Sequence, residues 1–315
     1  MGQASRLKRQ RRTSEKIIEP RSFILTDYLI GFFDVVGQST KLRQLKQVPT
    51  TDTETQQTIA LLKQTVGVVL GVRRMFDDFF QAASQPTSYL KSLPPAAQQQ
   101  VLSATRSEVK RWGISDSLIV AVPLMETGNP TLAVNGVRQS LIAAAGMWLL
   151  SLAAGHPLRG GIDVGVGLQI GPNEVYGSAL DSAYRLESKV AGGPRIVVGA
   201  TCIDYLNSVA SRAASDPLKQ LAQHAARECL SLLRQDEDGQ FIVDGLGPVM
   251  LNLVQTADAL GNKGELRSVA TTAHDAVKKQ LAEARASGNV TLISRYEALQ
   301  RYFDSNIGGW QTTSA

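Results

Sequence analysis

Apolar residues recur with the period of β-strands in some segments of the chain and with the period of α-helices in others. Apolar runs rich in β-branched and aromatic residues predict strands over residues 23–34, 108–114, 117–123, 158–170 and 195–198. Apolar residues three or four positions apart predict helices over residues 53–83, 133–154, 178–191, 200–234 and 258–303. Residues 241–254, around Gly245–Pro248, predict one more hairpin.

This order of elements predicts an α+β fold in which helices pack on an open, mostly antiparallel sheet. The helix over residues 53–83 carries an apolar stripe that is expected to face the core, broken once by Arg73. The strand after Leu158 lacks side chains at Gly160 and Gly161, which predicts that another group approaches its backbone closely.

Composition indicates a globular protein with a large core, since 43% of the 315 residues are apolar. A mean hydropathy of -0.07 excludes a multi-span membrane protein. The longest apolar stretch, Ser140 to Gly155, is shorter than the ~20 residues that a bilayer crossing needs and predicts a buried helix. Two cysteines without CxxC spacing and three scattered histidines support no disulfide, zinc or haem framework, so a cytoplasmic location is expected.

The positive charge is concentrated at the amino terminus. Residues 1–21 hold seven Lys and Arg against two Glu, which accounts for the whole net charge of +5. We expect a basic, solvated, flexible tail, with contact to nucleic acid or anionic lipid as the alternative. We therefore expect no specific nucleic-acid partner and consider a membrane partner unsupported.

Two aspartates stand at the ends of predicted strands. Asp34 ends the first apolar strand and is followed by a Gly37–Thr40 turn, a place where unpaired N–H groups can bind a polyphosphate and a carboxylate can hold Mg²⁺. Asp116 lies at the turn of the next hairpin, so it can lie beside Asp34 if that hairpin pairs with the first strand. Adjacent carboxylates repel unless a cation lies between them.

Four segments, in this order, resemble the sequence blocks of the class III nucleotide cyclase catalytic domain. They are Phe33–Ser39, Gly113–Val122, Leu158–Gly165 and Tyr176–Glu187. The resemblance covers residues 22–256 and implies a ferredoxin-like cyclase fold that works as a head-to-tail homodimer with two sites at the interface. Residues 257–315 then form a C-terminal helical extension.

The resemblance implies a metal and phosphate site. Asp34 and Asp116 match the two metal aspartates of the family, and the carbonyl of Val35 matches its backbone ligand. Two divalent metal ions per site, Mg²⁺ or Mn²⁺, are implied as cofactors. The phosphate-binding turn matches Gly37, Gln38 and Ser39.

The resemblance also implies a catalytic arginine and a reaction. Arg185 matches the arginine that the other protomer supplies to stabilise charge on the phosphate. The reaction is attack of the ribose 3′-hydroxyl on the α-phosphate of a nucleoside triphosphate, with pyrophosphate leaving. Asp181 stands where the family has an asparagine that orients the ribose, and a carboxylate there repels phosphate unless it binds a hydroxyl or a cation.

The base-reading positions depart from the purine cyclases of the family. Trp112 stands where those enzymes have the Lys or Glu that reads adenine or guanine, and its indole can stack on a base or fill the space of a second ring. The other base-reading position aligns with Glu174, which can accept a hydrogen bond from uracil N3–H or from the amine of cytosine. UTP is the favoured substrate and CTP the next.

The family's triphosphate-binding lysine has no match at Asp244 or Leu246. Another cation must then bind the terminal phosphates, and Arg43, Lys41 and Arg111 are the sequence candidates. A catalytically silent cyclase-like dimerisation module is therefore one alternative to an enzyme. An adenylate or guanylate cyclase with an altered base pocket is the other.

With no purine-reading residues and no sensor or membrane segment recognised in the sequence, the chain looks like the bacterial pyrimidine cyclases of the Pycsar antiphage systems. In that family the cyclic UMP or cyclic CMP made on infection activates a separate effector, which the cyclase does not contact directly. The resemblance implies a uridylate cyclase, a phosphorus-oxygen lyase, that makes a second messenger for antiphage defence.

Overall fold

The structure, a computed structural model, describes residues 25–38, 42–43, 45, 47–84, 94–96, 98–99, 103, 107–124, 133–171, 174–213, 217–257 and 265–311. The basic tail at residues 1–21 lies outside these residues, as do Ser39 and Lys41.

Eight strands of the described chain form one sheet. They are β1 (Leu25–Val35), β2 (Lys110–Ile114), β3 (Ser117–Pro123), β4 (Leu158–Gly171), β5 (Glu174–Gly177), β6 (Ile196–Val198), β7 (Leu233–Gln235) and β8 (Phe241–Val243). Their order is β2-β3-β1-β4-β6-β8-β7, with β5 paired to β4. All of these pairs are antiparallel except β4 with β6. The predicted α+β class and mostly antiparallel sheet are confirmed.

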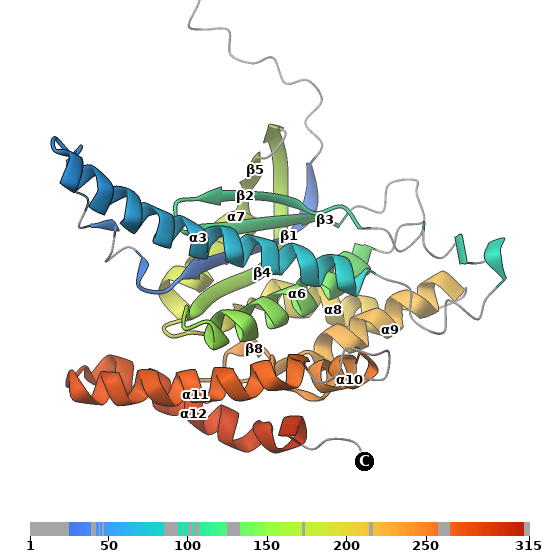
Figure 1. The fold of residues 1–315 in the computed structure, drawn as a ribbon. Coiled ribbons are helices and arrows are strands. Elements are labelled where there is room, and N and C mark those ends of the chain that lie inside the picture. The colour runs from blue at the N-terminus through green and yellow to red at the C-terminus, as the bar shows by residue number, and fades with distance from the viewer. Residues whose placement is uncertain are drawn as a thin grey trace, which may run out of the picture.

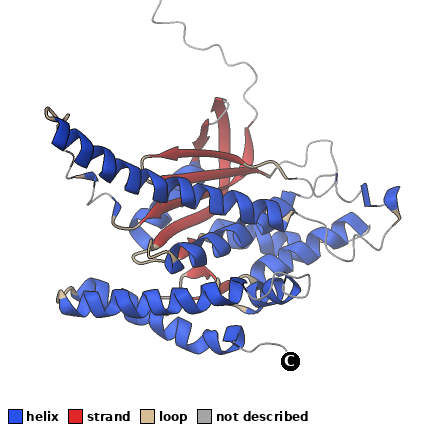
Figure 2. Ribbon diagram, viewed as in Figure 1, coloured by secondary structure: helices blue, strands red, loops and turns tan. Residues whose placement is uncertain are grey.

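Most helices lie on one face of this sheet. The helices are α3 (Asp52–Ala83), α6 (Ala133–Ala153), α7 (Ser178–Arg185), the π-helix η1 (Leu186–Val190), α8 (Ala200–Ser211), α9 (Pro217–Ser231), α10 (Pro248–Ala257), α11 (Glu265–Ala286) and α12 (Val290–Gln311). Figure 1 shows α3 and α6 crossing one face of the sheet, with α11 and α12 beyond α6, and Figure 2 shows the same layers coloured by type. Helix α7 packs on β4 and β1 from the other face.

Alternation along β1 divides its side chains between two hydrophobic clusters. Leu29 and Phe33 join the main core, while Tyr28 and Ile30 join a smaller cluster under α7. The main core continues without interruption into the C-terminal helices, where Trp310 is 1% exposed. The predicted helical extension therefore packs on the sheet domain through a shared core.

Among the described residues, α6 is the one helix long and apolar enough to cross a bilayer. In the structure, 83% of its apolar window is buried inside the protein. It packs between α3 and α11, so the prediction of a buried core helix is confirmed.

Two predictions at the end of the sheet are wrong. Residues 241–254 do not form a hairpin, because only Phe241–Val243 is a strand and Pro248 begins α10, a position where a missing N–H costs nothing. The partner strand is β7, inside the segment predicted as helix. The backbone of Leu246 bonds to α12 instead of a strand, donating to Tyr302 Oη at 2.7 Å and accepting from Trp310 Nε1 at 3.0 Å. Strand β5 was also not predicted.

The long helix α3 begins with a capping box, in which the Thr51 side chain accepts from the Glu54 N–H and the Glu54 side chain accepts from the Thr51 N–H. Its second half is buried through Phe76 and Phe80, as predicted. In its first half the stripe is exposed, with Ile59 44% and Val66 49% exposed, so the prediction that the whole stripe faces the core is wrong there.

Candidate functional site

The sheet brings the two predicted metal aspartates together. In the β1–β3 pair Asp34 lies opposite Ser117, and Asp116 directly precedes Ser117 in the β2–β3 turn. The Ser117 hydroxyl donates to Asp34 Oδ1 at 3.3 Å. Burial raises the pKa of Asp34, and the negative charge of Asp116 raises it further. The two carboxylates therefore lie within electrostatic range, at one end of β1.

An arginine and a buried glutamate complete this acidic cluster. Arg159 lies opposite Asp34 in the β1–β4 pair and donates from Nη2 to Asp34 Oδ2 at 3.2 Å. Its Nε lies 2.5 Å from Oε1 of Glu187, whose residue is 3% exposed. Burial raises the pKa of Glu187, Arg159 lowers it, and Asp34 and Asp116 raise it again. The guanidinium thus lies between two of three coupled carboxylates.

The contacts that Arg159 makes with Asp34 and Glu187 were not predicted from the sequence, although both Arg159 and Glu187 belong to segments that carry the family resemblance. Strand register is the signal that finds Arg159, because it fixes which residue of β4 faces Asp34. Glu187 is found only through the packing of the π-helix.

The glycines of β4 explain how Glu187 reaches this place. A Cβ on Gly161 would lie 2.3 Å from the Ala183 carbonyl and 2.6 Å from Leu186 Cβ. Only glycine lets α7 and η1 cross β4 at this distance. The predicted close approach is confirmed, and the approaching group is the chain's own helix.

The buried Asp163 of β4 fixes α7. Its carboxylate accepts from Ser182 Oγ at 2.5 Å on α7 and from the backbone N–H of Cys202 at 2.9 Å in the first turn of α8. Ser182 follows Asp181 directly on α7, which also carries Arg185. The orientation of both predicted catalytic residues therefore depends on this buried carboxylate.

The predicted phosphate turn follows β1 directly. Gly37 has φ of 90°, and a Cβ there would meet nothing within 4 Å, so the turn is open on that side. Gln38 is 3% exposed, and its side-chain Oε1 has no hydrogen-bond partner among the described residues. The structure keeps Val35, Gly37 and Gln38 beside Asp34, while Ser39 lies outside the described residues.

The donor set fits a hard divalent cation. Two carboxylates with a backbone carbonyl are oxygen ligands of the kind that Mg²⁺ and Mn²⁺ prefer. The negative charge of Asp116 raises the pKa of Asp34, which indicates a local need for positive charge that Arg159 partly meets. No group of three or more His, Cys, Asp or Glu side chains in the described chain has metal-binding geometry, so a metal ion held by Asp34 and Asp116 would need further ligands from the carbonyl of Val35 or from a substrate.

A second arginine reaches the turn that carries Asp116. Arg73 of α3 has Nη2 at 3.4 Å from the Ser117 carbonyl and 3.5 Å from that of Ser115. It passes over Gly113, where a Cβ would overlap its guanidinium. The interruption of the α3 stripe by Arg73 thus places a cation beside the candidate site.

The cations proposed from the sequence for the terminal phosphates have other positions. Arg111 pairs with Asp77 of α3. Arg43 is exposed, and Lys41 lies outside the described residues. Within the described part of the chain, Arg159 and Arg73 are the arginines that contact Asp34 and the Asp116 turn.

Trp112 lies on the face of the sheet that α7 covers. Its side chain is partly buried and packs with Phe32 and Leu180 against the smaller cluster. Glu174 is exposed at the start of β5. Lys110 donates to Gln169, so the β4–β5 hairpin reaches across the sheet to β2. No contact between Trp112 and Glu174 is recorded in the described chain, and their shared base pocket stays a prediction.

Asp181 and Arg185 are exposed on α7, one helical turn apart. No hydrogen bond or ion pair joins either residue to Asp34 within the described chain. Tyr184 lies between them in sequence on the same helix and is 51% exposed. This face of α7 therefore presents a charged pair beside an exposed aromatic side chain.

The geometry thus unites Asp34, Asp116 and Val35 at one end of β1 and leaves Asp181, Arg185 and Glu174 on an exposed face. A search against protein-family models and a search of curated proteins both found no match for this chain.

Proposed function

We propose that this protein is a class III type nucleotide cyclase that converts a pyrimidine nucleoside triphosphate, UTP before CTP, to the 3′,5′-cyclic monophosphate and pyrophosphate. The observation that carries the proposal is the coupling of Asp34 and Asp116 at one end of β1. Two adjacent carboxylates beside an open glycine turn fit a site for divalent cations and a triphosphate.

The reaction makes one bond and breaks one. The ribose 3′-oxygen bonds to the α-phosphorus, the bond from that phosphorus to the β-phosphate bridging oxygen breaks, and the hydroxyl proton leaves to solvent. Asp34, Asp116 and the Val35 carbonyl would hold divalent cations, which would acidify the hydroxyl and neutralise charge on the triphosphate. The chain's own residues position the triphosphate: the Gly37 turn offers N–H groups, and Arg159 and Arg73 offer the positive charge that the missing lysine would give.

The proposal includes a head-to-tail homodimer. Arg185 lies on an exposed face and makes no recorded contact with Asp34, so it serves a second protomer's site. Tyr184, which is 51% exposed and precedes Arg185 on α7, supplies apolar surface for that contact. The use of the product as an antiphage signal to a separate effector, and the cytoplasmic location, rest on the sequence resemblance.

The test is incubation of the full chain with ATP, GTP, CTP and UTP separately, each with Mg²⁺ and with Mn²⁺, followed by mass spectrometry of the products. Asp34→Ala is the site variant. Asp78→Ala is its matched control, because Asp78 pairs with Arg74 on the exposed face of α3. Cyclic UMP or cyclic CMP that is lost in Asp34→Ala and kept in the control supports the proposal. A purine product overturns the assignment of the base.

One observation favours a catalytically silent module as the second candidate. Arg159 already supplies part of the positive charge that Asp34 needs, without a bound metal. In that case no triphosphate is consumed with either metal, and the exposed face of α7 around Arg185 serves dimerisation alone. Absence of pyrophosphate release under every condition above favours this candidate.

A further inference from the structure

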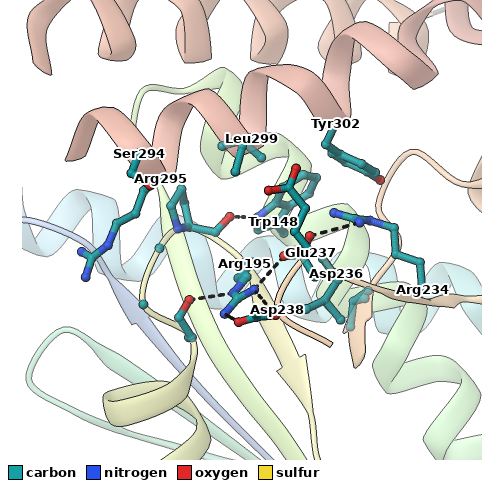
Figure 3. A pocket seen from close by; sticks show the side chains of 17 residues that line it. Trp148, Arg195, Arg234, Asp236, Glu237, Asp238, Ser294, Arg295, Leu299 and Tyr302 are labelled. Atoms are coloured by element: carbon teal, nitrogen blue, oxygen red, sulfur yellow. Dashed lines mark hydrogen bonds and ion pairs between the residues drawn. The ribbon is translucent and has the colours of Figure 1, made fainter. Parts of the chain in front are cut away.

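A cavity of about 270 Å³ lies beside the β6, β8 and β7 side of the sheet, whereas Asp34 lies on β1. Its walls are the loop of residues 191–195, the β7–β8 hairpin and α12, and Trp148 of α6 contributes to the wall between them. Figure 3 shows Arg234 and Tyr302 toward one side of it and Ser294 and Arg295 toward the other, with Arg195 and its acidic partners between them. No predicted site residue lines it, so its role is separate from the proposed catalysis.

The carboxylates around the cavity already have guanidinium partners. Arg195 donates to Asp236 at 2.7 Å and to Asp238 at 2.6 Å, and its remaining donors bond backbone carbonyls. Glu237 accepts three hydrogen bonds from Arg301, at 2.9, 3.0 and 3.1 Å. These ion pairs form part of the cavity wall. Each of the three lining carboxylates therefore already has a cationic partner from the chain.

Two arginines at the cavity have spare donors. Arg234 makes one ion pair, at 3.2 Å to Asp236, and its guanidinium lies 4.2 Å from the ring centroid of Tyr302. Its Nε is buried and has no hydrogen-bond partner among the described residues. Arg295 lines the cavity from α12 and has no recorded ion pair or hydrogen bond in the described chain. A buried donor without a partner is costly and often marks a missing water or ion.

We propose that this cavity binds a small organic anion, a carboxylate or a phosphate monoester carried by a flat apolar group. The anion pairs with Arg234, whose unpartnered donor is buried among the lining residues. The apolar group contacts Ile242, Leu299 and the ring of Tyr302, which line the same cavity. The volume suits a one-ring molecule rather than a nucleotide, because it is below the ~300–1,000 Å³ range of drug-sized sites.

The ligand joins two parts of the fold. One wall belongs to α12 of the C-terminal helices, and the other belongs to the sheet through β7 and β8. Because the walls come from segments far apart in sequence, the site exists only in the folded chain. Binding therefore stabilises the docking of α12 on the sheet by mass action.

The experiment uses four probes with the same ring and different charge: benzoate, phenyl phosphate, neutral benzamide and cationic benzamidine. Binding to the full chain is followed by saturation-transfer NMR and by thermal unfolding. At a free concentration of about ten times its Kd, benzoate or phenyl phosphate raises the Tm of the chain by ~2–4 °C, while benzamide and benzamidine do not change it.

Two variants test the site, and a third is the matched control. Arg234→Gln removes the guanidinium that pairs with the anion. Arg295→Glu reverses the charge of an exposed residue, so this variant is expected to fold. Both weaken the binding of the anionic probes by tenfold or more, on the scale of a charged hydrogen bond of about 1.5–3 kcal/mol. Arg285→Glu is the control, because Arg285 pairs with Glu297 away from the cavity.

Three results overturn the proposal. One is no binding of either anion at concentrations on the order of 10 mM. Another is equal binding of benzamide or benzamidine. The third is unchanged anion binding by Arg295→Glu and by any folded Arg234→Gln, which would place the probe elsewhere. None of these results bears on nucleotide turnover, so the two proposals fail separately.

Discussion

The Nη2 of Arg159 lies 3.2 Å from the Oδ2 of Asp34, so a cation of the chain itself contacts the predicted metal ligand. The same guanidinium lies 2.5 Å from the buried carboxylate of Glu187. A metal ion near Asp34 therefore has to share this carboxylate with Arg159 or displace it. This competition makes the stability of the chain sensitive to both Arg159 and divalent cations.

Arg159→Gln is expected to lower the free energy of unfolding by about 2–4 kcal/mol near neutral pH, because it leaves buried carboxylates without their counter-ion. Burial raises the pKa values of Asp34 and Glu187 above the ordinary 3.8 and 4.5. Their stability contribution is full below those values and is lost as pH rises through the folded-state pKa values. Arg159 lowers both pKa values, so its removal costs more at about pH 7.5 than at about pH 5.

Urea unfolding at both pH values, with and without Mg²⁺, measures this effect. Mg²⁺ is expected to restore part of the lost stability of Arg159→Gln. Arg138→Gln is the matched control, since Arg138 makes a similar half-buried pair with Glu228, at 2.6 Å, between α6 and α9. An equal loss of unfolding free energy at the two pH values, with no response to Mg²⁺ beyond that of the control, would contradict the prediction that Arg159 and a metal ion share the Asp34 carboxylate.

Arg195→Gln is expected to lower stability by about 2 kcal/mol at neutral pH, because the half-buried Asp236 loses its closer guanidinium partner, at 2.7 Å, and keeps only Arg234, at 3.2 Å. Burial raises the pKa of Asp236, but hydrogen bonds from Arg195 and the charge of Arg234 outweigh it and leave the pKa lowered. The Arg195 hydrogen bond also lowers the pKa of Asp238. Stability from a lowered carboxyl pKa is present above 3.8 and is lost as pH falls through the folded-state value.

The difference between wild type and Arg195→Gln should therefore shrink as the pH falls below about 4, which chemical unfolding across an acid series measures. Arg301→Gln is the control, because its pair with Glu237 is solvent-exposed and should leave stability unchanged. A constant difference at every pH would show that Arg195 acts through packing instead of charge.

The sequence pattern predicted the elements that build the candidate site, and it failed where elements are short. Apolar periodicity located β1, the β2–β3 hairpin and β4, so the approach of Asp34 and Asp116 was predictable. A three-residue strand carries too few positions for a period, so the helical pattern before it masked β7, whereas the apolar run of β6 was predicted as a strand.

The charged residues around the aspartates could not be found from local pattern. Arg159 is a single charge in a strand, and only the register of β4 against β1 places it opposite Asp34. Arg73 stood out only as an interruption of an apolar stripe, since its target, the β2–β3 turn, lies more than forty residues away. Glu187 depends on the passage of α7 and η1 over Gly161.

Trp112→Ala is expected to reduce kcat/KM for UTP by about tenfold or more, the scale of one lost base-stacking contact. The partly buried indole packs beside Phe32 and Leu180, and its removal opens space for a second ring. Activity with ATP should therefore fall less or rise. Trp112→Phe keeps an aromatic face and is the matched control. An equal loss of kcat/KM for UTP and for ATP would show that Trp112 serves packing and not base recognition. Steady-state kinetics with both nucleotides distinguishes the two outcomes.

Mixing two inactive variants tests whether Arg185 acts in the site of a second protomer. Asp34→Asn and Arg185→Ala should each lose at least ~100-fold in pyrophosphate release, because one removes a metal ligand and the other a charge at the transition state. In a mixed dimer, the Arg185→Ala protomer supplies Asp34 and the Asp34→Asn protomer supplies Arg185, so one of the two sites is intact. Because random exchange makes half of the dimers mixed, about a quarter of wild-type activity returns in an equal mixture.

The control for this complementation is a mixture of Asp34→Asn with Asp116→Asn. These aspartates lie side by side in one protomer, so no mixed dimer holds an intact pair and no activity returns. Native mass spectrometry of the mixtures confirms that subunits have exchanged. If exchange is complete and the first mixture stays inactive, Arg185 and Asp34 belong to the same protomer's site or to none. If activity returns in the first mixture and not in the control mixture, each site takes its metal ligands from one copy and its arginine from the other. The exposed position of Arg185 on α7 permits this arrangement.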